Sequence, residues 1–440
     1  MDDTSKITNI NGFNYEYEYT LSNKDGEIKF RDAAVVDFSI TDNIFNPFAD
    51  GHITVVNSYN HIESQLNLRG DGTDIFKIKF GPKEQPERVI EYEFVVLSEI
   101  NHIDDATEAK NRKTFILTAK DEILLSETFP YGKRCRGKVG DIIKDLLETT
   151  GLTVNKDVFE PGNITISAFP EFIIPSSSYR YKDLLYYLLQ YYYYIDGDLS
   201  TKGFLSKGSK GYELKTLSKD FFSKNEELVY EHFHAGDLVS KPTTNSNNPM
   251  SLGGEYKIYN NNIVSNNLTT PTEDISNSFL MNALVVGYDP ILGVSRMKEV
   301  RLQDVREKWA KKFVDVFKSV GGKPKKYLNL KATKKEGQFK QYRLPFNVID
   351  NANIVEADMV NSFLFYNQQL NINVMGDTGR KSGTFIDMFK VKDEKVKTDQ
   401  KLLGRWFITS VRHVKIANTF RNEIYCVKPY AGPDYNDTDA

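Results

Sequence analysis

Two histidines have side chains that could bind a metal ion or transfer a proton. His102 and His413 each close an alternating run that is typical of a β-strand, so both are expected at strand ends. Neither has a second histidine, a cysteine or a carboxylate at the spacing of a metal site. The pattern favours a structural role for both histidines over catalysis or metal binding.

Asp196 and Asp198 form an acid pair that could suggest glycosidase chemistry or a calcium loop. The further ligands of a calcium-binding loop do not follow in the sequence. Asp-Gly is also a frequent hairpin turn, and this one follows the tyrosine-rich run 191–195. We interpret both acids as turn residues between that strand and a returning strand that includes Phe204 and Leu205.

The segment from Gly376 to Ser382, GDTGRKS, resembles a phosphate-binding loop only superficially. It lacks the G-x-x-x-x-G-K-[ST] spacing, and it precedes a predicted strand where a phosphate loop would precede a helix. The sequence also contains no G-x-S-x-G and no H-E-x-x-H motif. We therefore expect no catalytic, cofactor-binding or metal-binding residues, no cofactor and no enzymatic activity.

A basic segment lies between Lys298 and Arg343, where apolar residues recur at helical spacing and Gly321-Gly322 ends the run. Acidic residues are interleaved with the basic ones, and aromatic residues that could stack on bases are not. A helix that faces solvent or another protein is therefore favoured over a nucleic-acid surface. The apolar positions are Leu302, Val305, Trp309, Phe313, Val316 and Val320, and the basic ones Arg306, Lys308, Lys311, Lys312, Lys318, Lys323, Lys325, Lys326, Lys331, Lys334 and Lys335.

The composition indicates a soluble chain of two to four domains, because 440 residues exceed one ordinary core. The net charge of -3 argues against a dedicated nucleic-acid surface, and no apolar run approaches the length of a membrane span. The polar start, Met1 to Lys6, is unlike a secretory signal, so synthesis in a cytoplasm is expected. Cys135 and Cys426 cannot form a disulfide framework, while 25 Tyr and 28 Phe are typical of β-rich proteins with large interfaces.

A β-module occurs twice in the sequence. Gly72 precedes His102 by thirty residues, and Gly383 precedes His413 by the same interval. With the histidines aligned, Val96–Asn101 lies over Phe407–Arg412, apolar on apolar and polar on polar. The pattern predicts strands at 72–80, 93–102 and 113–120 in one copy, and at 370–374, 383–391, 405–413 and 422–430 in the other.

These patterns together predict an α+β, mainly β fold in four regions. Residues 1–120 form the first module, with about six short strands that include 34–41 and 53–56 and a turn at Asn46–Gly51. Residues 121–224 form an α/β insert of helices and a hairpin. Residues 225–345 are rich in loops, notably 242–248 and 260–272, and part of this region could belong to the second module. Residues 346–440 complete the second module and a polar tail.

The insert should contain two amphipathic helices. Gly140–Gly151 places Ile142, Ile143, Leu146 and Leu147 on one face and ends at a glycine. A second helix is expected after Pro175, with N-caps among Ser176 to Ser178 and an apolar stripe formed by Tyr181, Leu184, Leu185, Leu188 and Leu189.

Three segments resemble the central baseplate hub subunit of contractile-tailed, T-even-like bacteriophages, a family related to the hub part of type VI secretion spike proteins. They are DAAVVDFSITDNIFNPFADGHITVVNS with the strand pair ending in KTFILTAKDEI, then IPSSSYRYKDLLYYLLQYYYYIDGD with KGYELKTLSKDFF, and last LNINVMGDTGRKSG with RWFITSVRH and NEIYCVKPY. Residues 225–350 match this pattern only by position.

The resemblance implies two antiparallel β-barrels similar to the tail-tube protein and a homotrimeric ring with pseudo-six-fold symmetry. Such a hub adapts a hexameric tail tube to a trimeric central spike and leaves a channel for tape measure and DNA. The implied partners are other copies of the chain, the spike, the tail tube or tube-initiator protein, the tape-measure protein and the baseplate wedge proteins. The implied location is the virion tail baseplate, assembled in the host bacterial cytoplasm, without sequence-specific DNA binding or membrane association.

Two other functions are compatible with the sequence. The polar end after Gly432, where a fused spike would continue into further domains, favours the phage hub over the fused secretion form. The hub of a non-viral contractile injection system remains an alternative. A tail-associated glycan or peptidoglycan hydrolase that uses Asp196 and Asp198 as its acids is an alternative of another class.

Overall fold

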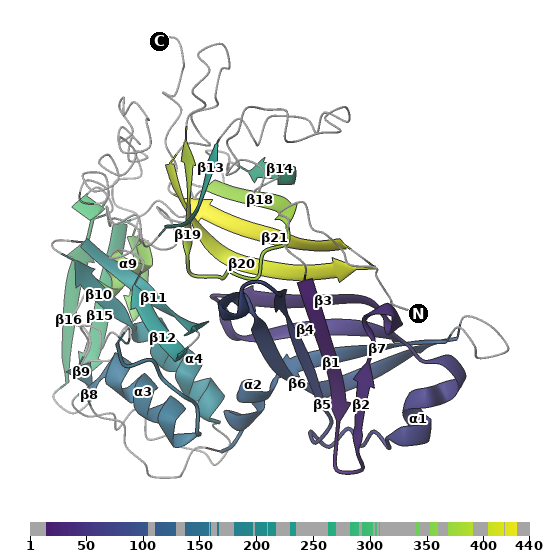
Figure 1. Cartoon of the computed structure of the whole chain (residues 1–440). Helices are drawn as coiled ribbons and strands as arrows, with labels where there is room; N and C mark the ends of the chain where they lie inside the picture. Colours follow the sequence, from purple (N-terminus) through teal and green to yellow (C-terminus); the bar gives the residue numbers. More distant parts are fainter. Residues whose placement is uncertain are drawn as a thin grey trace, which may run out of the picture.

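Strands dominate the fold. The computed structural model describes residues 15–103, 111–128, 137–157, 159, 165–166, 180–196, 199–208, 210–216, 229–234, 263–269, 282–289, 293–301, 304–305, 308, 339–343, 353–359, 368–389, 404–417 and 419–428. Most of these residues are in strands, and thirteen strands join into one large sheet (Figure 1). The predicted mainly β class is confirmed.

The first module contains seven strands that pair antiparallel in the order β3-β4-β7-β6-β5-β1-β2. Alternation explains them, because every second residue of β5 is fully buried: Phe76, Ile78 and Phe80. The elements are β1 (Tyr15–Ser22), β2 (Glu27–Phe30), η1 (Asp32–Ala34), β3 (Val35–Asn43), β4 (Asn46–Val56), η2 (Ser58–Asn60), α1 (His61–Gln65), β5 (Ile75–Pro82), η3 (Pro86–Arg88), β6 (Ile90–His102) and β7 (Arg112–Ala119).

The second module repeats this arrangement. Its strands are ordered β14-β18-β21-β20-β19-β13, which matches β3-β4-β7-β6-β5-β1 strand for strand, both in space and along the chain. One pair differs, since β13 runs parallel to β19 whereas β1 runs antiparallel to β5. The strand order agrees with the predicted duplication. The strands are β13 (Val229–His234), β14 (Ile263–Thr269), β18 (Gln368–Met375), β19 (Phe385–Phe389), β20 (Gly404–Ile416) and β21 (Thr419–Lys428).

Pairing of β20 with β3 joins the two modules into a single sheet, so the second module lies directly against the first (Figure 1). Among the described strands the hydrogen-bonded path is open and runs from β14 to β2. Closure of each module into a barrel therefore stays a prediction.

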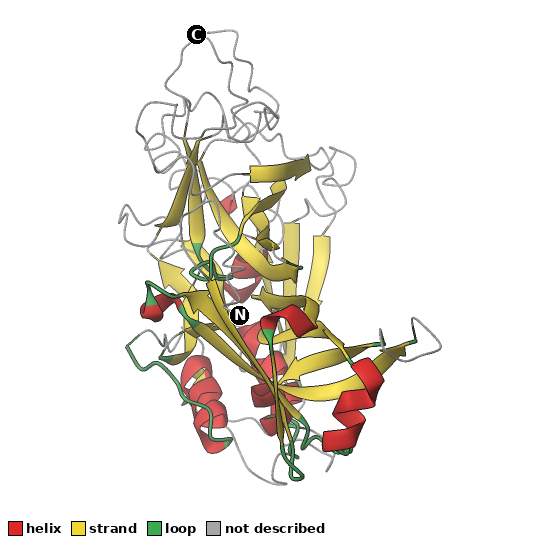
Figure 2. Ribbon diagram, turned by 45° about the vertical axis from the view of Figure 1, so that its right-hand side comes forward, coloured by secondary structure: helices red, strands yellow, loops and turns green. Residues whose placement is uncertain are grey.

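The insert lies beside the two modules (Figure 1), and Figure 2 shows that the helices of the chain, in red, lie on several sides of the strands. Two small antiparallel sheets, β8-β9 and β10-β11-β12, accompany the helices α3 and α4. The elements are α2 (Lys120–Leu124), β8 (Gly137–Lys138), α3 (Val139–Thr149), β9 (Thr165–Ile166), α4 (Tyr181–Tyr191), β10 (Tyr193–Asp196), β11 (Leu199–Gly208) and β12 (Gly211–Thr216).

Both predicted helices exist, but the start of the second differs from the prediction. Helix α3 buries the predicted apolar face, and Gly151 follows it with a φ of 85°, as expected of a helix stop. Helix α4 begins at Tyr181, where Asp183 accepts hydrogen bonds from the backbone and side chain of Arg180. The cap is therefore an acidic first-turn residue, and Ser176 to Ser178 lie outside the described residues.

The predicted turn at Asn46–Gly51 and the predicted loop at 260–272 are both wrong. Residues Asn46–Gly51 are part of β4, and the turn lies just before them, at residues 44 and 45, where Asn43 Oδ1 accepts the N–H of Phe45. Pro47 is tolerated in β4 because it lies where the register with β3 shifts. The predicted loop 260–272 contains β14, whose polar sequence suits an edge strand with β18 as its partner. The loop 242–248 lies outside the described residues.

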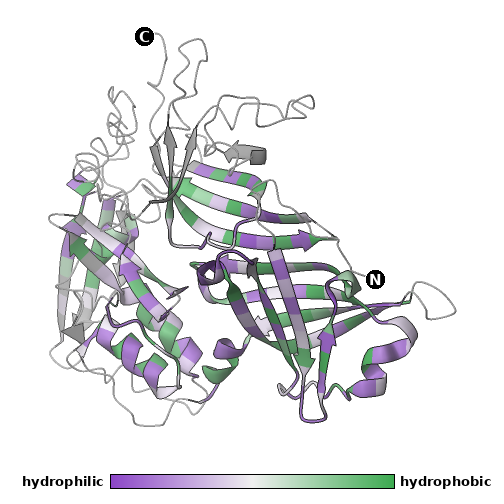
Figure 3. Cartoon of the chain, viewed as in Figure 1, coloured by the Kyte–Doolittle hydropathy of each residue, from purple (hydrophilic) through white to green (hydrophobic). Residues whose placement is uncertain are grey.

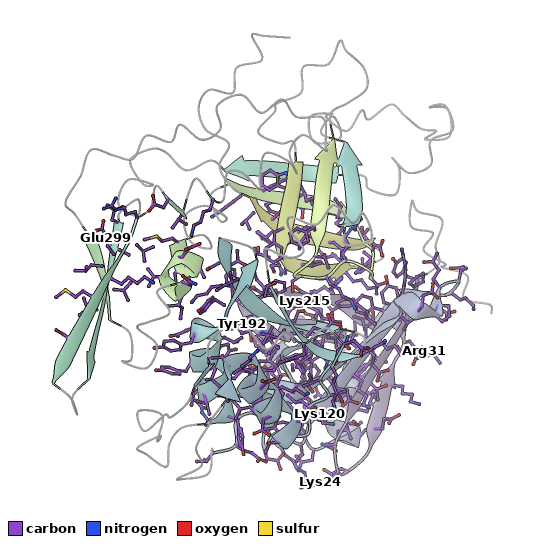
Figure 4. All side chains as sticks on the ribbon, turned by 90° about the vertical axis from the view of Figure 1, so that its left-hand side faces the viewer. Lys24, Arg31, Lys120, Tyr192, Lys215 and Glu299 are labelled. Atoms are coloured by element: carbon purple, nitrogen blue, oxygen red, sulfur yellow. The ribbon has the colours of Figure 1, made fainter. Side chains whose placement is uncertain are left out.

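A fourth sheet lies outside the large sheet, although Ala283 and Val285 of its strand β15 belong to the core of the insert and the second module. It has the order β16-β15-β17, from β15 (Asn282–Asp289), β16 (Val294–Val300) and β17 (Phe339–Arg343). Figure 4 shows Glu299 on this outlying sheet, far from Arg31 in the first module. Helix α9 (Asn353–Met359) ties the region to the insert, because Glu356 accepts the N–H of Ser200 at the start of β11.

Two hydrophobic cores hold the described residues together, and Figure 3 shows hydrophobic residues, in green, in the strands of both modules. One core belongs to the first module and also takes in Phe420 from β21. The other combines the insert with the second module, for example through Phe204 and Phe407, whose ring centroids are 5.2 Å apart. The insert is therefore packed against the second module.

Candidate functional site at the junction of the two modules

An antiparallel ladder forms the junction. It runs from Ser410 opposite Asn43 to Ile416 opposite Asp37, and all seven residues of this part of β20 have a partner in β3. A ladder of this length fixes both the register and the relative orientation of the modules, because a slip by one residue would reverse every side chain.

Asp42 connects the ladder to the loop that leads into β19. Its backbone oxygen accepts a hydrogen bond from Ser410 Oγ at 3.1 Å, and its carboxylate accepts one from the N–H of Ser382 at 2.8 Å. Burial raises the pKa of Asp42, and the Ser382 hydrogen bond and the charge of Lys381 oppose that rise. The loop 376–384 is thereby attached to the first module.

A buried polar cluster centres on Asn422 in β21. Asn422 Oδ1 accepts hydrogen bonds from the N–H of Asp377 at 2.6 Å and from Arg380 Nη1 at 2.7 Å. Because the amide oxygen is used in this way, the amide nitrogen faces His413 Nδ1, 2.8 Å away, and donates to it. His413 is then the neutral tautomer with its proton on Nε2.

His413 is sealed from solvent on β20. Phe80 and Phe420 lie 5.9 and 6.1 Å from its ring, and the side chain is 1% exposed. Burial lowers its pKa to about 3, and the nearby cation of Arg380 acts in the same direction. A neutral, enclosed imidazole of this kind is a structural hydrogen-bond acceptor and has no access to a substrate.

Further contacts join the loop 376–384 to the first module. Arg88 Nη1 lies 3.3 Å from the Asp377 carboxylate, and the Tyr15 hydroxyl donates to the Gly376 carbonyl at 3.2 Å. The Tyr15 ring lies 5.2 Å from that of Phe420, which is itself part of the first module's core. The two modules therefore exchange both polar and apolar contacts.

Lys415 is a second buried cation at the junction. It is 1% exposed, its Nζ lies 2.6 Å from Asp32 Oδ1, and it sits 4.8 Å from the centroid of the Tyr17 ring. The arrangement combines an ion pair with a cation–π contact across the modules. Because the side chain is buried, these first-module groups take the place of water around its ammonium group.

Replacing Asp32 with asparagine should destabilise the chain by about 2–3 kcal/mol, because Lys415 would keep a buried charge without its anion. We place the effect below that of a fully buried pair because the Asp32 side chain is 38% exposed. Urea unfolding at neutral pH measures it. Glu18→Gln, which removes the exposed Lys79–Glu18 pair, is the matched control and should leave the midpoint unchanged. Equal midpoints for both variants would contradict the assigned role of Lys415.

The two candidate histidines are not equivalent. His102 ends β6, is exposed, and has Nε2 3.0 Å from Thr114 Oγ1. His413 is inside β20, three residues before its end. Strand pairing places Val96 over Ile408, so the structural equivalent of His413 is Asn101. The alignment that superimposes the histidines is therefore wrong by one residue.

Asp196 lies at the predicted hairpin. Asp196 ends β10 opposite Leu199, the first residue of β11, and Phe204 and Leu205 belong to the returning strand as expected. Asp198 lies outside the described residues. The hairpin is confirmed, and the pairing of Asp196 with Leu199 accounts for the position of the Asp-Gly sequence.

The segment Gly376–Ser382 is a closed loop between β18 and β19. Asp377 accepts the N–H groups of Gly379 and Arg380, and the Arg380 side chain turns inward to Asn422 and is 0% exposed. A strand follows it, as the sequence predicts. The cation that would contact a phosphate is thus used inside the junction.

The basic segment is described only in part. Lys298, Arg301 and Lys308 are among the described residues, and Lys308 Nζ lies 3.1 Å from the Glu356 carboxylate. Arg301 pairs with Glu299 at 3.2 Å. Most of the predicted helix 302–320 and its lysines lie outside the described residues. That its basic face contacts solvent or another protein, and not nucleic acid, therefore stays a prediction.

Within the described part of the chain, no cluster of three or more histidines, cysteines or acids is arranged to hold a metal ion. The described helices are also too short or too polar to cross a membrane. The buried charges and hydrogen bonds of the junction have a structural role: they hold one module in a fixed position against the other.

Sequence reasoning missed Arg380, Asn422, Lys415 and Asp32. The sequence contained a signal for two of them, because alternate residues of a strand face the same side. Lys415 is on the same side of its strand as the buried Val411, and Asn422 is on the same side as the buried Phe420 and Ile424. A polar residue in a buried phase indicates a partner elsewhere. The identity of that partner depends on the pairing of distant strands.

Solved structures with a similar course of the chain are known. The tail protein from Neisseria meningitidis MC58 is 9% identical with a TM-score of 0.49, and the match covers 94% of this chain and 96% of that one. The 43 kDa tail protein of prophage MuSo2 from Shewanella oneidensis is 11% identical with a TM-score of 0.47, covering 94% and 100%. These are tail proteins.

A further match is to a chain of the Francisella PdpA-VgrG complex, 12% identical with a TM-score of 0.44, covering 96% of this chain and 60% of that one. No protein-family model and no curated protein sequence matches this chain. At these identities and TM-scores the likenesses describe the course of the chain and decide neither its family nor its function.

Proposed function

We propose that the chain is the structural hub of a contractile phage tail baseplate. Three copies form a ring with pseudo-six-fold symmetry that adapts the hexameric tail tube to the trimeric central spike. The tape measure and DNA pass through its channel, and the baseplate wedge proteins surround it. The hub has no enzymatic activity and is assembled in the host cytoplasm before it becomes part of the virion.

The observation that carries this proposal is the repetition of one strand arrangement within a single sheet. Two near-equivalent modules per chain present six similar units when three copies associate. The junction supports the same proposal, because a ring can imitate six-fold symmetry only if the two modules of each chain keep a fixed relative orientation. The buried contacts of Asn422 and Lys415 supply that rigidity.

We also propose the division of the chain that the sequence suggests. Residues 1–120 and 346–440, with strands from 225–345, form the two tube-like barrels, and 121–224 is the α/β insert. The barrels face a common axis, and the insert lies outside them.

The solution mass of the purified chain tests the hub. Sedimentation equilibrium, alone and with the spike protein of the same phage, should give an assembly of three times 50.4 kDa, with spike mass added in the second case. A chain that stays monomeric alone, with the spike and with the tube protein would overturn the proposal. Peptidoglycan degradation that is lost in Asp198→Asn would replace it with the hydrolase alternative.

A further inference from the structure

The middle strand of each module has two halves with different neighbours. In β20, the half from Gly404 to Phe407 pairs with β19, and the half from Ser410 to Ile416 pairs with β3 of the other module. In β6, the half from Ile90 to Val95 pairs with β5. The half from Ser98 to His102 pairs with β7 on one side only, as far as the described strands extend.

Matching β-bulges show that the two middle strands are equivalent residue by residue. The register of β6 with β7 shifts between Val96 and Ser98, and that of β20 with β21 shifts between Ile408 and Ser410. Each bulge lies where the strand changes neighbours. Since bulges re-aim a strand and are specific features of a sheet, the free half of β6 corresponds to the half of β20 that receives β3.

The strands at the far edges match in the same way. The register of β3 with β4 shifts between Val35 and Asp37, and that of β14 with β18 shifts between Ile263 and Ser265. β14 is therefore the counterpart of β3. β3 has two neighbours, β4 and β20, whereas β14 has only β18 among the described strands. Among the described strands, the two counterparts of the β3–β20 junction that lack this pairing are therefore the free half of β6, which would receive a strand, and β14, which would supply one.

We propose that β14 of one copy pairs antiparallel with the free half of β6 in a second copy, and so repeats between chains the junction that β3 and β20 form within a chain. The inference rests on the proposed ring and names its interface. Transferring the observed register through the bulges places Thr269 opposite Ile100, Leu268 opposite Asn101 and Asn267 opposite His102.

The surface of the free half of β6 fits this partner. Leu97, Ile100 and Ile103 are 57%, 49% and 78% exposed. An unpaired edge with exposed apolar residues promotes association unless another strand covers it. The charged residue between them, Glu99, is already paired with the buried Lys113 at 2.9 Å and does not oppose an incoming strand.

The pairing is heterologous, since different edges meet, and this has a geometric consequence. A chain that donates β14 and receives on β6 adds copies in one direction until the ring closes. Interchain and intrachain junctions then alternate around the ring. Each copy then contributes two similar junctions, one within the chain and one to the next chain. Three chains with two similar junctions each give the six similar contacts that pseudo-six-fold symmetry requires.

Disulfide trapping tests the interface. In a Cys135→Ser background, which keeps the buried Cys426, the pair His102→Cys with Asn267→Cys should yield covalent dimers and trimers on a non-reducing gel. The mismatched pair His102→Cys with Leu268→Cys places the thiols on opposite faces and should yield several-fold less. Each single variant should stay monomeric on the gel.

The outcomes separate the interface from the hub itself. A wild-type chain of trimeric mass whose matched pair cross-links no better than the mismatched pair would overturn the β14–β6 interface and leave the hub proposal standing. A wild-type chain that stays monomeric alone, with the spike and with the tube protein would overturn both. Ile100→Lys with Ile103→Lys is a second measurement, which should lower the trimer fraction, whereas Met297→Lys on β16, where the side chain is 68% exposed, should not.

Discussion

Replacing Asn422 with leucine should destabilise the chain by about 3–5 kcal/mol, the range measured when a buried charge loses a partner. Asn422 is 0% exposed and serves three groups at once. Its oxygen accepts from Arg380 and from the N–H of Asp377, and its nitrogen donates to His413. Leucine has a similar volume, so the loss arises from hydrogen bonds and not from a cavity.

Fluorescence of Trp406 can report this effect, because the indole is fully buried in β20 close to the junction. Urea unfolding in a Trp309→Phe background should show the midpoint of the transition falling strongly in Asn422→Leu. Glu423→Gln, one residue away on the partly exposed face, loses only a surface ion pair with Arg412 and should change the midpoint little. A midpoint for Asn422→Leu within error of Glu423→Gln would show that Arg380 does not depend on this amide.

Much of the sheet follows from local sequence patterns. Alternation located β3, β5, β6, β7, β18, β20 and β21 to within a few residues, and helical spacing located α3. These segments combine a clear period with a buried face, so their local preference and their tertiary environment agree. The same agreement made the duplication visible, because both copies keep the apolar phase on either side of a similar loop.

The failures have a different physical origin. β14 reads as Ile-Val-Ser-Asn-Asn-Leu-Thr, and its pairing with β18 is a long-range contact that composition cannot reveal. Pro47 suggested a turn, but a register shift allows it within β4. The alignment of His102 with His413 failed by one residue because the identical residue type suggested an equivalence that the strand pairing does not support: with the two bulges matched, His413 corresponds to Asn101.

The junction itself could not be derived from sequence, since its groups are distant in the chain. Lys415 and Asp32, like Arg380 and Asn422, are brought together only by the β3–β20 and β18–β21 ladders. A polar residue in an apolar phase announces that a partner exists. Which partner it finds is a property of the topology.

Lowering the pH should weaken the junction through His413, and this is the second large effect we expect. The folded chain holds the pKa of His413 at about 3, well below the ordinary 6.5, because burial and the nearby Arg380 disfavour the charged imidazole. Lys381 acts in the same direction, and Asp377 opposes it. A proton would also place a donor against the Asn422 amide nitrogen, 2.8 Å away.

The sign follows from the unfolded chain, which binds the proton first. Well above pH 6.5 both states are neutral and the full stability is present; it is lost as the pH falls toward 3, at about 1.4 kcal/mol per pH unit below 6.5. Between about pH 7.5 and about pH 5, the wild-type chain should therefore lose about 2 kcal/mol more than His413→Gln, which keeps an acceptor for Asn422 but cannot titrate. Subtracting the stability change of His413→Gln from that of the wild-type chain removes the contribution of the carboxylates, which titrate in both proteins. Asp42 is among them, and its raised pKa acts on stability with the opposite sign. Parallel stability curves for the two proteins over this range would mean that the imidazole is not held neutral by the junction, and the rigid coupling of the two modules would need another cause.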